Sequence, residues 1–297
     1  MVEILVVVLN YNTKVLTEKC LKSIVDKKWK RKIKVVVVDN ASTDGSLEYL
    51  KKKFKTVSFI VSKSNLGFAG GNNLALKRHF KDAEFCLILN SDTEVLEGSL
   101  DSLYDFAKSG FDIASPKLIN KDGSFQPNGG ELPYLWPLFL WLSGLDDIFR
   151  RFINIPSYQE RSLSYYKKGR VGWVSGTAML VKNEVFDRIG FFDDNIFMYG
   201  EDVDFCFRAR KAGFKIGWTD SAEVIHLGGG SLDRPQFRQW LGEFKGLLYF
   251  YKKHFGKMAK VGLLILIYIF VFFRIIAFWF IGKKEYAKTY VKILREI

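Results

Sequence analysis

The sequence predicts an α/β fold in which βαβ units build a parallel sheet. Three observations support this prediction. Four short apolar runs of strand length lie in the first hundred residues, helical patterns separate them, and a polar or glycine-rich stretch follows each run. Parallel strands are buried on both faces and therefore appear in a sequence as continuous apolar runs that alternate with helices.

The predicted elements follow in order along the first hundred residues. The expected strands are 4–9, 33–38, 57–61 and 85–89. Between the first two, Leu16, Cys20 and Ile24 recur at i, i+4 and i+8, which is typical of an amphipathic helix. Residues 47–54 and 72–80 are expected to form two further helices.

Residues 111–230 have a less regular pattern. Residues 117–125, with Asp122-Gly123 at the centre, predict a hairpin. A strand is expected at 177–181, a helix at 201–212, and two short strands at 215–218 and 222–225. Segments of this kind are expected to supply the second half of a ligand site.

The strand ends are the most informative positions. They are followed by Asn10-Tyr11-Asn12, by Asp39-Asn40-Ala41-Ser42, by residues 64–73, and by Asn90-Ser91-Asp92. Each stretch alone has the composition of an ordinary turn. Ligands of open α/β sheets bind beyond the carboxyl ends of the strands, so four such stretches on one edge favour a nucleotide cleft.

The net charge of +13 is unevenly distributed. From residue 250 onward there are ten Lys and Arg against two Glu, so this tail contributes 10 − 2 = +8. These cations flank an apolar segment, which favours anionic membrane lipids over nucleic acid as the partner.

Residues 261–281 are almost entirely apolar, as expected of a membrane helix. Basic residues flank both ends, and Arg274 lies inside the segment, where a charge is costly. A single span and an in-plane or re-entrant helix pair with both ends cytoplasmic therefore both remain open. The shorter apolar stretch at 133–155, which ends in the basic pair Arg150-Arg151, is either an interfacial amphipathic helix or a lid packed on the domain.

The three cysteines, Cys20, Cys86 and Cys206, are widely spaced within apolar patterns, which predicts buried thiols in a reducing compartment. The N-terminus starts directly with a strand pattern and has no basic n-region. We therefore expect no signal peptide and a cytoplasmic catalytic part.

Several carboxylates and one histidine are candidates for chemistry. Asp39 is placed to accept a hydrogen bond from a base or ribose, and Asp92 is placed to bind a divalent cation, although both residue types also cap helices. Three acids follow an aromatic turn in Phe197-Met198-Tyr199-Gly200-Glu201-Asp202-Val203-Asp204, where one carboxylate suffices as a general base. His226 ends a predicted strand before a glycine run and is a candidate second metal ligand.

These segments resemble the family-2 inverting glycosyltransferases of the GT-A fold, in particular rhamnosyltransferase-like members. The matching segments are VVVLNYN (6–12), VVDNASTDGS (37–46), NLGFAGGNN (65–73), LILNSDTEV (87–95), GWVSGTAMLVKNEVFDRIGFFDD (172–194), FMYGEDVDFCFRARKAGF (197–214) and HLGGGS (226–231). The resemblance implies a Rossmann-like mixed sheet flanked by helices, with a C-terminal membrane-associated segment. The expected boundaries are a catalytic domain at 1–232, a basic connecting segment at 233–260, and a membrane helix with a basic tail at 261–297.

The resemblance also implies roles for individual residues. Asp202 would be the catalytic base, and Asp92 with His226 would hold Mg²⁺ or Mn²⁺. The acceptor would be bordered by Trp173, Gly176 and Glu201. The expected donor site comprises Leu9, Asn10, Tyr11, Asp39, Asn65, Gly67, Asn73, Asn90, Ser91 and Asp92.

Two departures from the family pattern matter. Asn90 and Ser91 stand where a DXD-like motif has its first two positions, so Asp92 is expected to depend on His226. The segment from Gln236 to Trp240 has Gln239 where processive members carry Arg, which predicts transfer of a single sugar. The expected partners are a UDP- or dTDP-sugar donor, a lipid-linked or glycan acceptor and anionic lipids at the cell membrane, and nucleic acid is not expected. The alternative is a catalytically inactive, membrane-bound nucleotide-sugar-binding protein that acts as a sensor or assembly partner.

Overall fold

A mixed β-sheet forms the centre of the catalytic region. The computed structural model describes residues 1–149, 155–228 and 237–297, and within them the sheet has nine strands in the order β3-β2-β1-β4-β10-β6-β11-β5, with β7 paired to β6. The strands are β1 (Val2–Asn10), β2 (Ile33–Asp39), β3 (Ser58–Val61), β4 (Ala83–Asn90), β5 (Thr93–Val95), β6 (Ile113–Ile119), β7 (Phe125–Gln126), β10 (Ala178–Lys182) and β11 (Ile216–His226). A small two-stranded sheet pairs β8 (Gly129–Gly130) with β9 (Trp173–Val174).

The four strands expected in the first hundred residues are confirmed as a parallel set. β1 pairs in parallel with both β2 and β4, and β2 pairs in parallel with β3. The register places Asn10 beside Asp39 and Leu9 beside Asn90, so the polar stretches that follow these strands meet at one edge. β10 runs antiparallel to β4 and makes the sheet mixed.

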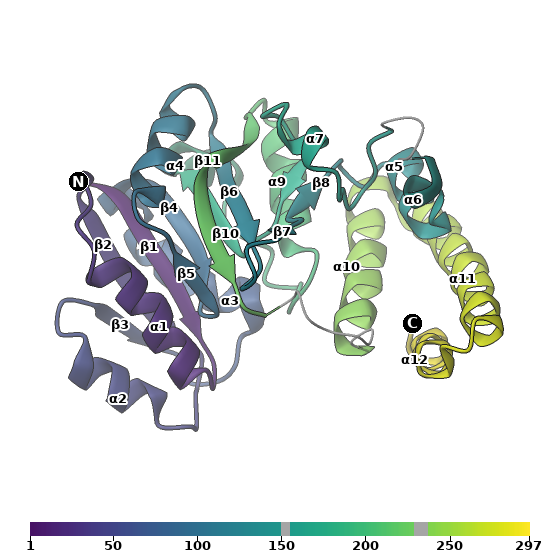
Figure 1. Cartoon of the computed structure of the whole chain (residues 1–297), viewed down its shortest axis with the longest axis horizontal. Coiled ribbons are helices and arrows are strands. Elements are labelled where there is room, and N and C mark those ends of the chain that lie inside the picture. Colours follow the sequence, from purple (N-terminus) through teal and green to yellow (C-terminus); the bar gives the residue numbers. More distant parts are fainter. Residues whose placement is uncertain (150–154, 229–236) are drawn as a thin grey trace.

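Helices cover both faces of the sheet (Figure 1). Because strand side chains alternate, Ile4, Val6 and Val8 pack with α1 (Lys14–Val25), α2 (Ser46–Lys53) and α4 (Ser99–Lys108). Leu5 and Val7 face the opposite layer, which contains α3 (Gly67–His79), α8 (Asn183–Ile189) and α9 (Glu201–Lys211). The short helices α5 (Leu135–Ser143), α6 (Leu145–Phe149) and α7 (Leu163–Tyr166) and the 3-10 turn Phe80–Asp82 complete the region.

Two boundaries differ from the sequence prediction. The glycine-rich stretch expected to be a loop forms the first turns of α3, which begins at Gly67. A Cβ at Gly71 would lie 2.5 Å from Leu9 Cδ1, so the missing side chain lets α3 approach β1 closely. The two short strands expected at 215–218 and 222–225 form one strand, β11, which pairs with β6 on both sides of a register shift between Thr219 and Glu223 and with β5 at Val224–His226.

Three helices follow the sheet and lie to its right in Figure 1: α10 (Phe237–Phe255), α11 (Lys257–Phe280) and α12 (Lys284–Glu296). Their buried residues, among them Phe244, Ile267 and Tyr290, belong to the same hydrophobic cluster as the α9 face of the sheet. α11 is the one described helix that is long and apolar enough to cross a membrane by length and composition. The expected domain boundaries at 232 and 260 stay a prediction.

Candidate active site

The first two strand ends form a hydrogen-bonded turn. Asn10 donates from Nδ2 to Asp39 Oδ2 at 2.7 Å and to Ser46 Oγ at 2.8 Å, and Asp39 Oδ1 accepts from the Ser42 amide at 3.0 Å. Both Asn10 and Asp39 are buried. Asp39 does not cap the following helix, because α2 has Gly45 at its N-cap and its nearest carboxylate is Asp44. Asp39 is therefore held in the strand-end turn, where it was expected to meet the nucleoside.

The other expected donor residues lie at this edge with different surroundings. Tyr11 is 45% exposed, and Leu9 is partly buried beneath α3. Asn65 Oδ1 accepts from the Gly67 amide at 2.9 Å and shapes the start of α3. Asn73 instead bonds Phe192: its Nδ2 donates to the Phe192 carbonyl at 2.9 Å, and its Oδ1 accepts from the Phe192 amide at 3.2 Å. The Asn73 side chain thus fastens α3 to the segment before α9, and its expected role in nucleoside binding stays a prediction.

Unusual backbone conformations gather at the same edge. Asn12, Ala41 and Tyr199 have positive φ values of 53°, 66° and 71°. The first two follow β1 and β2 by two residues, and the third precedes α9 by two. Such conformations cost on the order of 1–3 kcal/mol each and persist where the surrounding structure enforces them, most often at functional sites.

The Asn90-Ser91-Asp92 turn joins β4 directly to β5. The helix-cap alternative for this turn is excluded, because α4 begins at Ser99 with Gly98 at its N-cap. The pairing of β11 with β5 places His226 beside Thr93, and the Leu227 amide donates to the Asp92 carbonyl at 2.9 Å. As expected, the fold brings Asp92 and His226 together.

The Asp92–His226 pair fits a divalent cation. His226 Nε2 lies 3.4 Å from Asp92 Oδ1, and His226 Nδ1 lies 2.7 Å from Gln126 Oε1. If Nδ1 donates to Gln126, Nε2 presents its lone pair on the Asp92 side, as in metal sites where a second residue orients the histidine. A Cβ at position 228 would lie 1.9 Å from Asp92 Oδ2, so the glycine leaves room for the carboxylate.

In the part of the chain that the structure describes, no group of three or more His, Cys, Asp or Glu has the arrangement of a metal site. A cation held by this pair would therefore need further ligands from a diphosphate and from water. The glycine run at 229–230, Ser231 and Gln236 lie outside the described residues, as do Arg150 and Arg151.

The first two residues of α9 are acids. Asp202 accepts from the Gly176 amide at Oδ2 (3.0 Å) and from the Val203 amide at Oδ1 (2.8 Å). Glu201 is 4% exposed, and its buried Oε2 has no hydrogen-bond partner among the described residues. Burial raises the pKa of both carboxyls, and the neighbouring charge of Asp202 raises the pKa of Glu201 further. Both groups therefore hold protons more tightly than a free carboxyl does.

The expected acceptor residue Trp173 packs into a wall of aromatic side chains. Its Nε1 donates to the Tyr158 carbonyl at 2.8 Å, and the rings of Trp173 and Tyr158 stack at 5.4 Å. The Phe68 amide donates to the Phe197 carbonyl at 2.8 Å, which joins the start of α3 to the turn before α9. Through this link the predicted donor and acceptor halves adjoin.

Three residues at the site were missed by sequence reasoning. Gln126 orients His226, and Tyr158 donates to Glu243 Oε1 at 2.5 Å. Glu243 is the one acid of α10, and that isolation within a basic helix was the available signal. Gln126 and Tyr158 lie in segments without periodicity, so no sequence pattern pointed to them.

Comparison with known proteins identifies the family of the chain. Residues 5–190 match the model of glycosyl transferase family 2. A Mycobacterium tuberculosis N-acetylglucosaminyl-diphospho-decaprenol L-rhamnosyltransferase is 28% identical over 221 residues, which is 66% of this chain and 67% of that protein. The Haloferax volcanii low-salt glycan biosynthesis hexosyltransferase Agl10 is 27% identical over 64% of this chain and 58% of its own length. Rhamnosyltransferase WbbL of Escherichia coli is 27% identical over 65% and 72%.

Solved structures agree on the fold. Staphylococcus aureus TarS residues 1–349 align with a TM-score of 0.54 at 17% identity over 84% of this chain and 64% of that one. GalNAc-T7 with UDP, GalNAc and Mn²⁺ aligns with a TM-score of 0.58 at 14% identity over 84% and 50%. The expected GT-A fold is confirmed, and the chain spans half to two thirds of the length of these two structures.

Proposed function

The chain belongs to glycosyl transferase family 2, and from this premise we propose that it transfers a single sugar with inversion of the anomeric centre. The proposed donor is a UDP- or dTDP-sugar carrying rhamnose or another hexose. The proposed acceptor is a lipid-linked or polysaccharide hydroxyl at the cytoplasmic face of the membrane. The rhamnosyl- and hexosyltransferase relatives support this substrate class.

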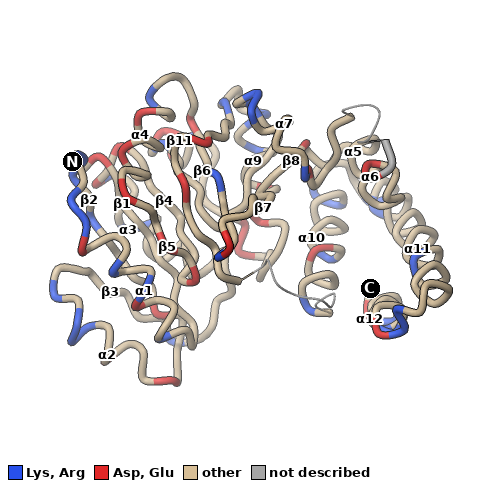
Figure 2. Tube along the Cα trace, in the orientation of Figure 1, with Lys and Arg blue, Asp and Glu red and all other residues tan. Residues whose placement is uncertain are grey.

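One observation carries the proposal: Asp39, the Asp92–His226 pair and Asp202 converge on one edge of the sheet. Asp39 lies at the end of β2, His226 at the end of β11, and Gly176, which binds Asp202, precedes β10 at the same edge. These three places suit a nucleoside, a diphosphate and an acceptor hydroxyl in turn. Acidic residues lie near the lower ends of the strands in Figure 2, which does not suit a polyanionic nucleic acid at this edge of the sheet.

Asp202 is the proposed base. Its two backbone hydrogen bonds orient the carboxylate, and burial strengthens it as a proton acceptor. The acceptor oxygen gives its proton to Asp202 and forms a bond to the anomeric carbon. On the opposite side of that carbon the bond to the diphosphate breaks, and the nucleoside diphosphate leaves with the bonding electrons. Attack opposite the leaving group inverts the centre.

Asp92 and His226 would hold a divalent metal ion, Mg²⁺ or Mn²⁺. When bound, that ion supplies positive charge that neutralises the departing diphosphate. Asn90 and Ser91 would support the position of Asp92, since the Asn90 amide donates to the Thr177 carbonyl at 2.9 Å and Ser91 Oγ lies 3.0 Å from Thr13 Oγ1.

The test is transfer by an Asp202→Asn variant with a metal-loaded nucleotide sugar. We expect kcat to fall roughly 10²–10⁴-fold because the amide cannot accept the proton, while donor affinity by calorimetry stays within about twofold. Asp187→Asn is the matched control, because Asp187 is an exposed acid on α8 that pairs with Lys81. Near-normal turnover by Asp202→Asn removes Asp202 as the base. Donor binding without turnover in the wild-type protein favours the sensor alternative instead, and a panel of nucleotide sugars in the same calorimeter identifies the donor.

We also propose that α11 and α12 lie in the plane of the membrane. α11 exposes one continuous apolar face, made of Val261, Ile265, Tyr268, Ile269, Phe272, Phe273, Ile276, Trp279 and Phe280. Its other face packs on protein, and Arg274 points there, because its Nη2 donates to the Trp141 carbonyl at 2.9 Å. The internal charge is therefore kept away from the exposed apolar face.

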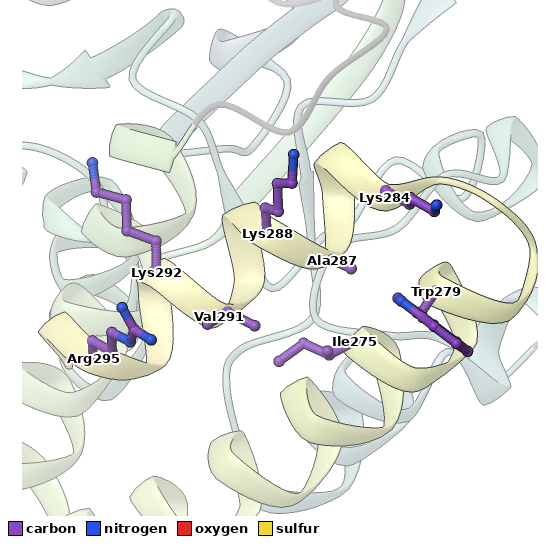
Figure 3. A pocket seen from close by; sticks show the side chains of 8 residues that line it. All are labelled: Ile275, Trp279, Lys284, Ala287, Lys288, Val291, Lys292 and Arg295. Carbon is purple, nitrogen blue, oxygen red and sulfur yellow. The ribbon is translucent and has the colours of Figure 1, made fainter.

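The position of α12 argues against a single span. α12 returns antiparallel along the second half of α11, where Phe278 stacks on Tyr290 at 5.7 Å and Tyr268 donates to the Leu294 carbonyl at 3.0 Å. If α11 crossed the bilayer upright, the cations of α12 would enter the hydrocarbon at about 2.5–3.5 kcal/mol each. A groove of about 590 Å³ lies between the two helices. Figure 3 shows the side chains that line it: the apolar Ile275, Trp279, Ala287 and Val291, and the basic Lys284, Lys288, Lys292 and Arg295. An apolar lining beside cations suits the boundary between acyl chains and anionic headgroups.

Cysteine labelling in cells tests this orientation. A cysteine at Lys292 is expected to react only with membrane-permeant reagents, because both ends of α11 stay on the cytoplasmic side. Background labelling is low, since burial raises the pKa of Cys20 and Cys86 to about 12 and raises the pKa of Cys206 strongly. Labelling at 292 by an impermeant reagent from outside would establish a span.

A further inference from the structure

Helix α10 lies in backbone contact with the turn that leads into the proposed catalytic helix. A Cβ at Gly246 would lie 2.3 Å from the Tyr199 carbonyl oxygen, and a Cβ at Gly242 would lie 2.5 Å from Tyr199 Cδ2. Both glycines therefore let α10 meet Tyr199 and Gly200, the two residues before Glu201. Glu243 lies between these two contacts on the same helix.

Glu243 is tied to the wall of the proposed acceptor site. Tyr158 donates its hydroxyl proton to Glu243 Oε1 at 2.5 Å, and the Gln159 side chain also bonds this carboxyl. Tyr158 is fully buried and stacks on Trp173. One phenol thus connects the α10 carboxyl to a residue expected to border the acceptor.

The charged groups around Glu243 are mostly acids. The charge of Asp202 raises the pKa of Glu243, and the charge of Glu243 in turn raises the pKa of Glu201 and of the Tyr199 phenol. The basic side chains at the contact between α9 and α10 lie beside a different acid. Arg208, Lys253 and His254 all pair with Asp204, at 2.7–2.8 Å. The carboxyl cluster of Glu201, Asp202 and Glu243 therefore balances its charge mainly by holding protons.

We infer that Glu243 is a positioning residue of the proposed transfer reaction, acting through Asp202 by setting how strongly that carboxylate takes a proton. The inference rests on the proposed function of Asp202. It assigns a catalytic influence to α10, the helix that also leads to the membrane segment.

The expected behaviour follows from the protonation of the cluster. Burial and the charge of Asp202 raise the pKa of Glu243 to about 7, although the bond from Tyr158 lowers it. Below that pH Glu243 is neutral, and above it the new negative charge makes proton uptake by Asp202 more favourable. A stronger base gives a faster transfer, so the rate acquires a step near neutral pH.

The test is the pH profile of kcat for the full-length protein. In the wild type we expect a rise through about pH 7, and in Glu243→Gln we expect no such rise and a kcat at pH 8 about tenfold lower. Glu243→Asp is expected to restore part of the step, and Tyr158→Phe to move it to higher pH by removing a bond that stabilises the ionised form. The control is Asp193→Asn: Asp193 holds the same helix through Tyr249 at 2.9 Å and Lys253 at 2.8 Å but lies outside the cluster. This control is expected to lower Tm without changing the profile.

An unchanged step in Glu243→Gln overturns the inference, and so does a profile in Asp193→Asn that matches Glu243→Gln. A failure of the proposed function would give different results in these assays. Full turnover by Asp202→Asn, or none by the wild type, would refute Asp202 or the activity. The Tm of the wild type and of Glu243→Gln can still be compared in that case. If Glu243 belongs to the cluster, the difference between the two Tm values changes across pH 7. A difference that does not change with pH would refute its membership.

Discussion

The residue pair Gln126–His226 places the imidazole of the candidate metal site. Gln126 is 9% exposed and reaches Nδ1 of His226, so it selects the tautomer that leaves Nε2 free for a cation beside Asp92. The two residues are 100 positions apart in the chain. Gln126 matters because Asp92 is the single carboxylate of the turn at residues 90–92, so metal binding also depends on His226.

Replacing Gln126 with Leu is expected to weaken Mn²⁺ binding in the presence of nucleoside diphosphate about 10–100-fold, because the imidazole loses its orienting partner. Isothermal calorimetry measures the loss. Gln239→Leu, an exposed residue of α10, is the control and should bind as the wild type does. Equal Mn²⁺ affinity in both variants would mean that the His226 orientation does not control the site.

Among the residues that the structure describes, Asp204 takes part in the most ion pairs, three. It is fully buried and contacts Arg208, Lys253 and His254. Burial acts to raise the pKa of Asp204, but the bonds from His254 and Lys253 and the charge of Arg208 outweigh it, so the pKa is lowered. A carboxyl with a lowered folded-state pKa stabilises the fold above its unfolded pKa, and this contribution is lost as the pH falls through the folded-state pKa.

Asp204→Ala is therefore expected to reduce the free energy of unfolding at pH 7 by about 3–5 kcal/mol, since it removes the buried carboxylate that joins three basic side chains of α9 and α10. Urea unfolding measures the change. The difference from the wild type should shrink below about pH 4, where the wild-type carboxyl begins to lose its advantage. A difference that is constant with pH would show that lost packing, rather than lost charge, causes the effect.

At the scale of elements, the close approach of α3 to β1 depends on a single residue. Gly71 allows it, because any Cβ there would meet Leu9. The same approach brings the start of α3 to the strand-end turn, where Asn40 donates from Nδ2 to the Gly67 carbonyl at 3.0 Å. The sequence pattern predicted a glycine-rich loop at this place, whereas in the structure Gly71 lies inside α3 and allows the helix to contact Leu9.

Gly71→Ala is expected to lower the free energy of unfolding by about 1–3 kcal/mol, because the added methyl group overpacks the Leu9 contact. Gly262→Ala is the matched control: Gly262 is also inside a helix, but its added Cβ would have no atom within 4 Å. That change should be neutral or slightly stabilising, since Ala has a higher helix propensity. If both variants have the same free energy of unfolding, the close packing of α3 on β1 does not limit the stability of the fold.

At the scale of the whole molecule, the catalytic region and the C-terminal helices are joined by a continuous core. α10 contacts Asp204 of α9 and Tyr199 of the turn before it, and α11 and α5 pack beside α10, with Trp141 stacked on Trp240 at 5.7 Å. α5 thus packs as a lid on the C-terminal helices, while Leu135 and Trp136 at its start remain exposed. The face of α11 for which we propose membrane contact is therefore connected to the proposed active site through packed helices.

Charge reversal on α12 should separate lipid binding from general electrostatics. Lys284→Glu with Arg295→Glu is expected to reduce co-sedimentation with vesicles of anionic phosphatidylglycerol at least tenfold, at about 1 kcal/mol per cation. It should change binding to neutral phosphatidylcholine vesicles much less. Lys51→Glu with Lys52→Glu on α2 makes the same change in net charge far along the chain and should keep binding near the wild-type level. Equal losses in the two double variants would refute the α12 surface.

The sequence by itself determined the parallel strands, the polar stretches at their ends and the apolar α11, because these depend on local periodicity and on strand direction. It also suggested Asp39 and Asp92 as one set, because parallel strands end on the same edge, whereas Asp202 was suggested by the acids after the aromatic turn and by the family resemblance. The tertiary structure alone decided which distant residues meet: His226 with Gln126, Tyr158 with Glu243, and α12 along α11. Such contacts arise from strand crossovers and helix packing, whose geometry no local pattern encodes.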